Sequence, residues 1–505
     1  MIGSFQKNRL PEDTKPIGLS WLVEYFNLTL PLRDLSSISD KRLAQQKIQK
    51  GIWRVFDIQF SIDEYPFSHL AFSIKHEKLD LLVLKYILKA FPKEELTRNI
   101  NSNPKKILHK KIWFYYEFLL ESRLELDDLP VGRYDTLLDE KKYIVSKQPI
   151  KSKRHKLNIN LLGTAKMSAI ITKTPTLQAY MDLDLKNDIS SVIAKVSPSL
   201  VQRASSFLLL ADSRASFEIE GERVSQNRIE NWGKIINEAG KTALSIVELE
   251  RLHSILLKDS RFIQIGLRTN EVFLGDRDRD YFPIPEFIGA KSENLKVLIE
   301  ALIELDKILG EIELDPVLHA VIIAFAFVYI HPLEDGNGRI HRYIIHHVLA
   351  QRDFYPKGMI FPISSVILDE ISNYRDILVS HTSPLMSMIE WKSSLKGNVE
   401  ILNDTSDLYR FFDCTQSCEF IYKLVDKTIK ETLPNELKYL DTFDKAYSAI
   451  YAMIEMPNNQ IKQLITFILQ NNGRLSKKKK EKYYDKLTPQ EVEEIEAIVS
   501  SVFDI

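Results

Sequence analysis

The sequence predicts a mainly α protein with several domains, and three observations support this prediction. At 505 residues the chain is much longer than a typical single domain, and a prior of about 150 residues per domain suggests roughly three units. The stretch from Val317 to Ile330 is apolar on nearly all sides and follows Asp315-Pro316, which is a favourable helix start. Residues 488–491 read Thr-Pro-Gln-Glu, a capping box that precedes another helical pattern.

Residues 1–165 predict an accessory domain of unknown role. Two clusters, Trp21 to Phe26 and Trp113 to Leu120, combine apolar and aromatic residues among frequent lysines, so we expect helices around a small core. Residues 151–156 read Lys-Ser-Lys-Arg-His-Lys. This cluster could bind nucleic acid, but an exposed connecting loop is the favoured interpretation.

Residues 187–395 predict the central helical unit. The buried helix that ends at Ile330 is followed by a polar loop and then by a second helix, whose apolar stripe consists of Ile340, Ile344, Ile345, Val348 and Leu349. The two helices are therefore expected to hold the polar loop on a rigid platform.

The polar loop and the helix after it read His-Pro-Leu-Glu-Asp-Gly-Asn-Gly-Arg-Ile-His-Arg at residues 331–342. Gly336, Asn337 and Gly338 let the backbone approach an anion, and the Asn337 side chain can add a donor. Arg339 opens a helix whose free N–H groups and dipole attract negative charge, and Arg342 follows on the same helical face. The stretch therefore predicts a phosphate-binding site.

These residues resemble the active-site motif of the Fic family, His-Pro-Phe-x-(Asp/Glu)-Gly-Asn-Gly-Arg-x-x-Arg. Leu333 stands where the family usually has phenylalanine, and we interpret it as a changed core anchor because a bulky apolar residue is kept. Gly-Asn-Gly alone is a common turn, so the joint spacing of the motif carries the inference. The resemblance implies a mainly α fold, with a Fic-type helical core and a small β-hairpin flap between mostly helical N-terminal and C-terminal domains.

The resemblance also implies a protein adenylyltransferase, which transfers AMP from ATP to a serine, threonine or tyrosine hydroxyl of a target protein. His331, with an ordinary pKa of about 6.5, would accept the hydroxyl proton. Asp335 would bind Mg²⁺, which prefers one or two carboxylates plus phosphate oxygens and water. Arg342 would face the γ-phosphate. Gly338 favours AMP transfer, because a family member that acts as a kinase has lysine there.

Upstream, Ser216-Phe217-Glu218-Ile219-Glu220-Gly221 resembles the (Ser/Thr)-x-x-x-Glu-(Gly/Asn) inhibitory motif of many Fic proteins. We expect an inhibitory helix near residues 213–221. If Glu220 pairs with Arg342, the arginine is withheld from the γ-phosphate and the carboxylate repels that phosphate. Taken alone, serine and glycine at these places also describe the caps of any short surface helix.

Between these two motifs, Asn270 to Gly275 and Tyr281 to Pro285 predict two short extended segments around a charged turn. The Fic family has a hairpin flap at this position, with Val272, Phe273 and Leu274 as the expected target-contacting residues. The flap would hold an extended segment of the target by β-augmentation. An ordinary edge hairpin stays open as the alternative.

Residues 396–505 predict a C-terminal helical domain. Ser476 precedes four lysines at 477–480, and the capping box leads into a helix with Val492, Ile495, Val499 and Val502. Four lysines could mark a site for nucleic acid or an acidic partner, but acidic residues follow closely. A solvated helix face is therefore favoured.

Composition narrows the partners that we expect. The net charge of −1 gives no basic field over the whole molecule, so nucleic acid is not an expected partner. The most apolar run is too short to span a bilayer and the first residues lack a signal-peptide core, so a cytoplasmic protein without membrane contact is expected. Cys414 and Cys418, the two cysteines, predict buried or incidental thiols. Pairing into a homodimer stays open.

Two alternatives to an autoinhibited adenylyltransferase remain at this point. In the first, Glu220 positions water to remove AMP from an already modified target, as some Fic proteins do. In the second, the Fic core is vestigial and the terminal domains bind nucleic acid as a regulator. Intact His331, Asp335 and Arg342 argue against this second alternative.

Overall fold

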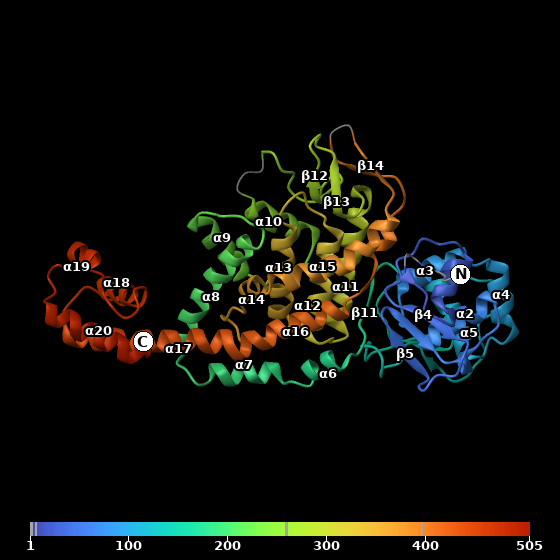
Figure 1. Ribbon diagram of the computed structural model, residues 1–505, viewed down its shortest axis with the longest axis horizontal. Coiled ribbons are helices and arrows are strands. Elements are labelled where there is room, and N and C mark those ends of the chain that lie inside the picture. The colour runs from blue at the N-terminus through green and yellow to red at the C-terminus, as the bar shows by residue number, and fades with distance from the viewer. Residues whose placement is uncertain (1–3, 6–7, 258–260, 395–396) are drawn as a thin grey trace.

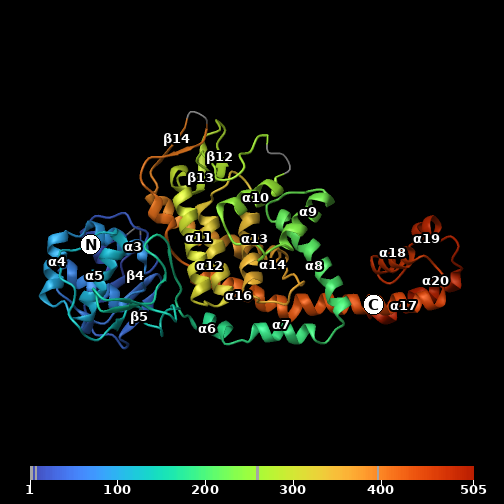
Figure 2. The ribbon, with the colours of Figure 1, turned by 180° about the vertical axis from the view of Figure 1, so that it is seen from behind.

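The computed structural model describes residues 4–5, 8–257, 261–394 and 397–505. An N-terminal domain lies at one end of an elongated molecule, a helical body forms the middle and a small helical module lies at the other end (Figure 1). The view from behind shows the same order (Figure 2). The prediction of a mainly α fold is confirmed. Among the described helices, none has the length and apolarity that a membrane crossing requires.

The N-terminal domain contains β-sheets, whereas only helices around a small core were predicted. Its main sheet has the strand order β3-β4-β6-β5, in which β4 and β6 run parallel, and a smaller sheet has the order β7-β9-β8. Helices still cover more of this domain than strands. Its elements are β1 Ser4–Phe5, β2 Asn8–Arg9, β3 Thr14–Pro16, α1 Leu19–Tyr25, β4 Leu35–Ser39, β5 Lys47–Lys50, β6 Trp53–Phe56, α2 Pro66–His76, α3 Leu81–Ala90, α4 Lys93–Ser102, α5 Ile107–Leu120, β7 Asp135–Thr136, β8 Ile150–Ser152, β9 Leu157–Ile159 and β10 Leu162–Gly163.

The basic cluster at residues 151–156 is not the exposed loop that we expected. It forms the turn between β8 and β9, and the Arg154 side chain is only 12% exposed. Arg154 Nη2 lies 2.8 Å from Glu117 Oε1, and its guanidinium lies over the Trp113 ring. The expectation was wrong because acidic partners distant in sequence, Glu117 and Asp128, neutralise this arginine and fold it inward.

The helical body is arranged around α12 Pro316–Ile330, and every residue from Val317 to Ile330 is buried. Asp315 Oδ1 accepts hydrogen bonds from Val317 N at 2.9 Å and Leu318 N at 3.1 Å, which confirms the predicted helix start. Figure 1 shows α12 within the body. The other helices of this body are α6 Pro175–Met181, α7 Leu185–Ile193, α8 Pro198–Glu218, α9 Gln226–Ile236, α10 Ile246–Leu256, α11 Leu295–Glu311, α13 Asn337–Gln351, α14 Ile363–Asp369, α15 Ile371–Leu385 and α16 Thr415–Lys427.

Two hairpins lie at one edge of this body. Strands β12 Phe273–Arg277 and β13 Pro283–Ile288 pair antiparallel and form the hairpin that was predicted between the two motifs. Strands β14 Trp391–Ser393 and β15 Val399–Ile401 form a second hairpin beside it. Arg277 Nη1 donates to the Gly397 carbonyl oxygen, and Asn398 Nδ2 donates to the Glu271 carbonyl oxygen at 2.7 Å. The second hairpin therefore braces the first.

The expected boundary between residues 395 and 396 lies outside the described residues, and the packing changes later in the chain. Strand β16 Phe411–Asp413 pairs in parallel with β11 Ser168–Ile170, and α16 packs against α12. One continuous hydrophobic core extends as far as Leu433. Cys414 and Cys418 are free and buried in it, as predicted.

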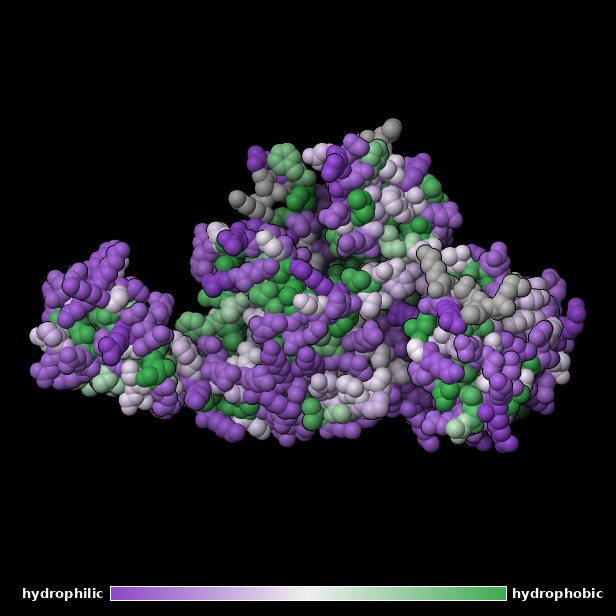
Figure 3. Space-filling view, viewed as in Figure 1, coloured by the Kyte–Doolittle hydropathy of each residue, from purple (hydrophilic) through white to green (hydrophobic). Residues whose placement is uncertain are grey.

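Beyond this core, α17 Leu433–Met453 leads to a separate module with its own hydrophobic cluster. This module contains α18 Asn458–Leu469, α19 Lys477–Tyr483 and α20 Pro489–Phe503, and its visible face is mainly hydrophilic (Figure 3). The Thr488 side chain accepts from Glu491 N, and the Glu491 side chain accepts from Thr488 N, which confirms the capping box.

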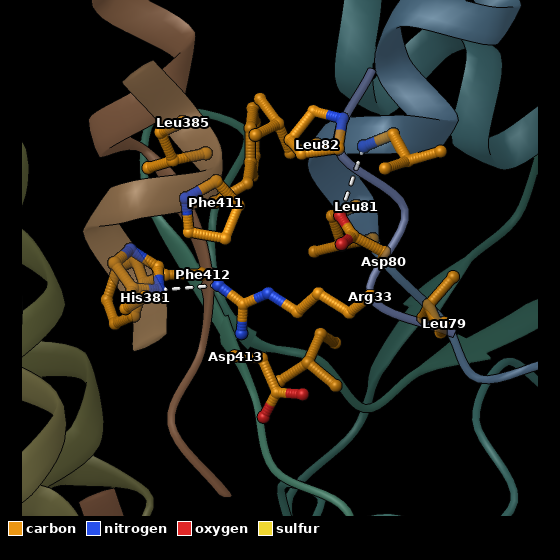
Figure 4. A pocket seen from close by; sticks show the side chains of 14 residues that line it. Arg33, Leu79, Asp80, Leu81, Leu82, His381, Leu385, Phe411, Phe412 and Asp413 are labelled. Atoms are coloured by element: carbon orange, nitrogen blue, oxygen red, sulfur yellow. Dashed lines mark hydrogen bonds between the residues drawn. The ribbon is translucent and has the colours of Figure 1, made fainter. Parts of the chain in front are cut away.

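The N-terminal domain meets the body around α15. Arg33 of the N-terminal domain extends toward α15, where its Nη2 lies 2.8 Å from His381 Nδ1 (Figure 4). Because arginine can only donate, His381 Nδ1 is the acceptor and carries no proton. Burial, and then the charge on Arg33, lower the pKa of His381 to about 3. The His381 ring also stacks on Tyr329 of α12, with ring centroids 3.9 Å apart.

Candidate active site

The polar loop between α12 and α13 depends on two residues with left-handed backbone conformation. His331 ends α12 with φ 55°, and its N–H bonds to the Phe327 carbonyl oxygen at 3.0 Å. Gly336 begins α13 with φ 82°, and a Cβ at this position would collide with Leu256. The backbone conformation at 336 therefore favours glycine, and a side chain there would also displace the end of Leu256.

His331 is oriented by its own helix. Its Nδ1 lies 3.2 Å from the Val328 carbonyl oxygen, and since a carbonyl can only accept, Nδ1 carries the proton and Nε2 keeps its lone pair. The Phe287 ring lies edge-on at 5.5 Å between centroids. Burial, and then the charge on Arg268, lower the pKa of His331 to about 4. The imidazole is therefore neutral at neutral pH, as a proton acceptor must be.

The glycine turn places the start of α13 at the site. The first N–H groups of this helix, at Asn337, Gly338 and Arg339, have no acceptor within the helix, so they can bind an anion. We had expected the Asn337 side chain to add a hydrogen-bond donor for the anion, and this expectation was wrong. Its Nδ2 donates to the Leu333 carbonyl oxygen at 2.8 Å and its Oδ1 accepts from Leu333 N at 3.0 Å. Asn337 thereby braces the loop, and the Leu333 side chain is fully buried in the core.

Arg339 is buried and already bound to two carboxylates. Its Nη2 lies 2.9 Å from Asp335 Oδ1, and its Nη1 lies 2.5 Å from Glu222 Oε1. Asp335 Oδ1 also accepts from Gly336 N at 2.6 Å. The Asp335 side chain is 47% exposed, so its carboxylate is accessible from the cavity.

Arg342 is fully buried and bound to the end of α8. Its Nη2 lies 2.8 Å from Glu220 Oε1 and 2.7 Å from the Ser216 carbonyl oxygen, and its Nε donates to Ser216 Oγ at 3.3 Å. Gly221, with φ 75°, follows directly. A Cβ at Gly338 would collide with Glu220 Oε1, so the carboxylate lies directly against the glycine turn. The structure thus brings Ser216, Glu220 and Arg342 together.

The end of α8 and the residues after it contact α13 at regular intervals, and one of these contacts was not predicted from the sequence. Residues 212, 216 and 220 follow one another at four-residue steps and meet residues 346, 342 and 338 in reverse order. The missed residue is Asp212, whose Oδ2 lies 2.9 Å from His346 Nε2 and whose Oδ1 accepts from Ser364 N at 2.6 Å. The polar face of α13 is therefore buried against α8.

A cavity of about 560 Å³ joins these elements. Its lining includes His331, the glycine turn, Asp335 and Glu220, together with the flap residues Val272, Phe273 and Leu274. The Leu274 side chain is half exposed, whereas Phe273 is partly buried under the Arg277 guanidinium, 5.0 Å from the ring centroid. The predicted flap residues therefore do lie at the mouth of the site that contains His331.

One wall of this cavity was not predicted. Helix α15 contributes Ile371, Tyr374, Arg375 and Leu378. Burial raises the pKa of Tyr374 to about 12, so its hydroxyl stays protonated. The apolar members of this wall suit a flat ring, and Arg375 adds a cation. In sequence these residues belong to an ordinary amphipathic helix, so no local signal marks them.

Comparisons with known proteins agree with the motif. A model of the Fic/DOC family matches residues 243–349, which include the flap and the catalytic loop but not α8. Protein adenylyltransferase fic-1 of Caenorhabditis elegans is 27% identical over 124 residues, which is 24% of this chain and 22% of that protein. The match thus spans about a fifth of the relative's length.

Two solved structures are similar at 18% identity and a TM-score of 0.37. One is a Fic domain containing signaling protein from Bacteroides thetaiotaomicron, with 52% of this chain and 96% of that chain covered. The other is a Fic family protein from Desulfovibrio desulfuricans, with 55% and 80% covered.

Proposed function

Residues 243–349 of this chain form a Fic/DOC-family domain, and on that premise we propose that the protein is an autoinhibited adenylyltransferase. It transfers AMP from ATP to a serine, threonine or tyrosine hydroxyl of a target protein, and the chain itself is one candidate target. The observation that carries the proposal is the cavity in which a neutral, oriented His331 faces the glycine turn.

The chemistry assigns a separate task to each group. Nε2 of His331 takes the proton from the attacking hydroxyl, the new P–O bond forms at the α-phosphorus, and pyrophosphate leaves with the electrons of the broken bond. The N–H groups at the start of α13 hold phosphate oxygens. A pKa of about 4 makes His331 a weak base, and the negative charge of a triphosphate acts to raise that pKa.

The residues present also fit Mg²⁺. Asp335 is a half-exposed carboxylate at the cavity, and Mg²⁺ needs only one or two carboxylates when phosphates and water supply the remaining ligands. Bound there, the ion would offset phosphate charge. Asp335 would have to exchange its contact with Arg339 for the ion.

Autoinhibition rests on the position of Glu220. Its carboxylate occupies the space beside Gly338 and binds Arg342, so it holds the place and the cation that an outer phosphate would use. Because Glu220 remains 35% exposed, it can leave without unfolding the core. A triphosphate and Glu220 therefore compete for the same arginine.

Incorporation of label from ATP tests the proposal. We expect Glu220→Gly to raise incorporation from [α-³²P]ATP into the chain or its targets by at least about tenfold, the effect of about 1.4 kcal/mol. His331→Ala should abolish it in both backgrounds. Label from [γ-³²P]ATP should not be incorporated. Equal α-label with and without His331 would refute the role of His331, and γ-label would indicate a kinase instead.

One observation favours a second activity for the same site. Glu220 and His331 line the same cavity, so Glu220 could position a water molecule for removal of AMP from a modified side chain. Release of AMP from a pre-modified protein by the unaltered chain, lost in Glu220→Gly, would support this direction. No release at any protein concentration would contradict it.

A further inference from the structure

The N-terminal domain contains a second cavity, of about 410 Å³, and none of its lining residues lines the catalytic cavity. Helix α2, the first turns of α5 and residues 137–143 surround it. The proposed adenylyl transfer does not involve this cavity, so the residues that line it must have a different role.

Four lysines from separate segments line this cavity: Lys75, Lys106, Lys111 and Lys142. In the described part of the chain, none of their ammonium groups makes an ion pair or hydrogen bond, whereas the neighbouring Lys110 lies 2.7 Å from Asp135. Burial lowers the pKa of Lys111 even though Asp139 and Asp135 act in the other direction. Lys75, Lys106 and Lys142 are exposed, whereas Lys111 is half-buried. Like charges around one cavity repel one another, which favours a bound anion.

The start of α5 adds to this positive field. Lys106 is the N-cap residue, no side chain caps the helix, and its first turn has no acidic residue. A cation at a helix N-terminus is unfavourable, and the first N–H groups have no acceptor within the helix. Ile107 and Leu108 of this turn line the cavity. The start of α5 therefore lacks the negatively charged or capping side chain that usually stabilises a helix N-terminus. An anion in the cavity would supply the missing negative charge.

The acidic residues at the cavity do not neutralise the lysines. Glu77 turns its carboxylate away toward the start of α1, where Oε2 accepts from Leu19 N at 2.9 Å. Burial raises the pKa of Glu77 to about 7, so it carries only part of a charge at neutral pH. Asp139 is exposed, and its Oδ1 accepts from Lys141 N at 3.0 Å. Cations therefore outnumber anions at this site.

A buried hydroxyl and an apolar wall complete the site. Tyr115 lies one helical turn after Lys111, is 1% exposed and lines the cavity, yet its hydroxyl makes no hydrogen bond within the described residues. Apolar side chains form the remaining wall, namely Ile74, Leu79, Leu137 and Leu138. A volume near 400 Å³ is in the range of small-molecule sites.

We propose that this cavity binds a small organic molecule that carries a phosphate group. The phosphate lies against the lysines and the start of α5, the Tyr115 hydroxyl donates to it, and the organic part packs on the leucines. A phosphate suits this site better than a carboxylate because it brings up to two negative charges and more acceptor oxygens.

Binding of phenyl phosphate to the full-length chain, measured by calorimetry, tests this proposal. Inorganic phosphate serves as the probe without an organic part, and benzoate serves as the carboxylate probe. We expect phenyl phosphate to bind most tightly, inorganic phosphate more weakly and benzoate most weakly. Benzoate binding as tight as phenyl phosphate, or inorganic phosphate binding tighter, would overturn the proposal, as would no binding of either phosphate at millimolar concentration.

Two lysine variants locate the binding. Lys111→Met and Lys142→Met should each weaken phenyl phosphate by about tenfold, which corresponds to about 1.4 kcal/mol. The matched control Lys141→Met changes an exposed neighbour that does not line the cavity, and it should leave binding within about twofold. Since Lys142 is exposed, its variant should fold even if Lys111→Met does not. Affinity that survives both variants would place the phosphate elsewhere, such as at the catalytic loop, and would refute this site.

Discussion

The two arginines of the catalytic motif are both bound to acids that follow α8. Glu220 binds Arg342, and two residues later Glu222 binds Arg339 at 2.5 Å. Glu222 also lies 3.3 Å from Arg228 of α9. The segment after α8 therefore pairs with both arginines of the proposed phosphate site, and the proposed inhibitory motif accounts for only one of these pairs.

Glu222→Gln should release part of this second contact. Because the Glu222 side chain is one-third exposed, we expect only about a two- to fivefold rise in label incorporation from ATP. In the double variant with Glu220→Gly, the two free-energy effects should add, so the two fold increases should multiply. Glu218→Gln, an exposed acid on the same helix end, serves as the control and should have no effect. Lower incorporation in Glu222→Gln would instead show that Glu222 positions Arg339 for catalysis.

At the scale of single residues, the sequence predicted which loop residues lie at the cavity better than it predicted their surroundings. The identities and spacing of His331, Asp335 and Arg342 are local, so they could be interpreted directly. Asp212 and the α15 wall could not be found in this way, because their contacts join residues far apart in sequence and belong to ordinary helical patterns. The Asn337 side chain was misjudged because its role depends on the turn geometry.

The flap is an element whose position depends on its neighbour. The segment between β14 and β15 braces it, because the Gly397 carbonyl oxygen accepts from Arg277 and the Asn398 side chain donates to the Glu271 carbonyl oxygen. Strand β12 has its own irregularity, a register shift between Leu274 and Gly275. The segment that would meet a target is thus held in place before a target arrives.

Phe273→Asp should impair labelling of a target protein by about tenfold or more while ATP binding changes little. The reason is that Phe273 lies at the mouth of the cavity, on the strand expected to pair with the target. Ile284→Asp, an exposed residue on β13 that does not line the cavity, is the matched control. Labelling that is equally impaired in both variants would assign the effect to hairpin stability.

Elements with strong local signals were predicted well. The Asp315-Pro316 start, the capping box at Thr488 and the flap hairpin all have short-range causes. The N-terminal sheet was missed because its strands are only two to five residues long, too short for a clear alternation. Leu35–Ser39, for example, is buried throughout although three of its residues are serine.

At the scale of the whole molecule, buried neutral histidines set the response to acid. Burial is the main cause that lowers the pKa of His69 and His331 to about 4 and of His341 and His381 to about 3. Unfolded histidines have a pKa of about 6.5 and take up protons first as the pH falls. The stability they confer is therefore present above pH of about 6.5 and lost as pH falls toward 4.

We expect the free energy of unfolding, measured with urea, to be lower at pH 5.5 than at pH 7.5. The loss should be on the order of 1 kcal/mol per buried histidine. Carboxyl groups whose pKa is raised by burial, namely Glu77 (to about 7), Asp80 and Glu436, act in the opposite direction. The histidines outnumber them, because burial also lowers the pKa of His76, His109, His253 and His347. Equal stability at the two pH values would contradict these buried, neutral states.

Helix α15 contacts both the cavity that contains His331 and the N-terminal domain. Tyr374 and Arg375 line the cavity that contains His331, and two turns later His381 accepts a hydrogen bond from Arg33 of the N-terminal domain. If α15 shifts as a rigid unit, seating of the N-terminal domain and occupancy of this cavity are thermodynamically linked. By reciprocity, whatever free energy a ligand of the N-terminal domain adds to nucleotide affinity, nucleotide returns in equal measure to that ligand.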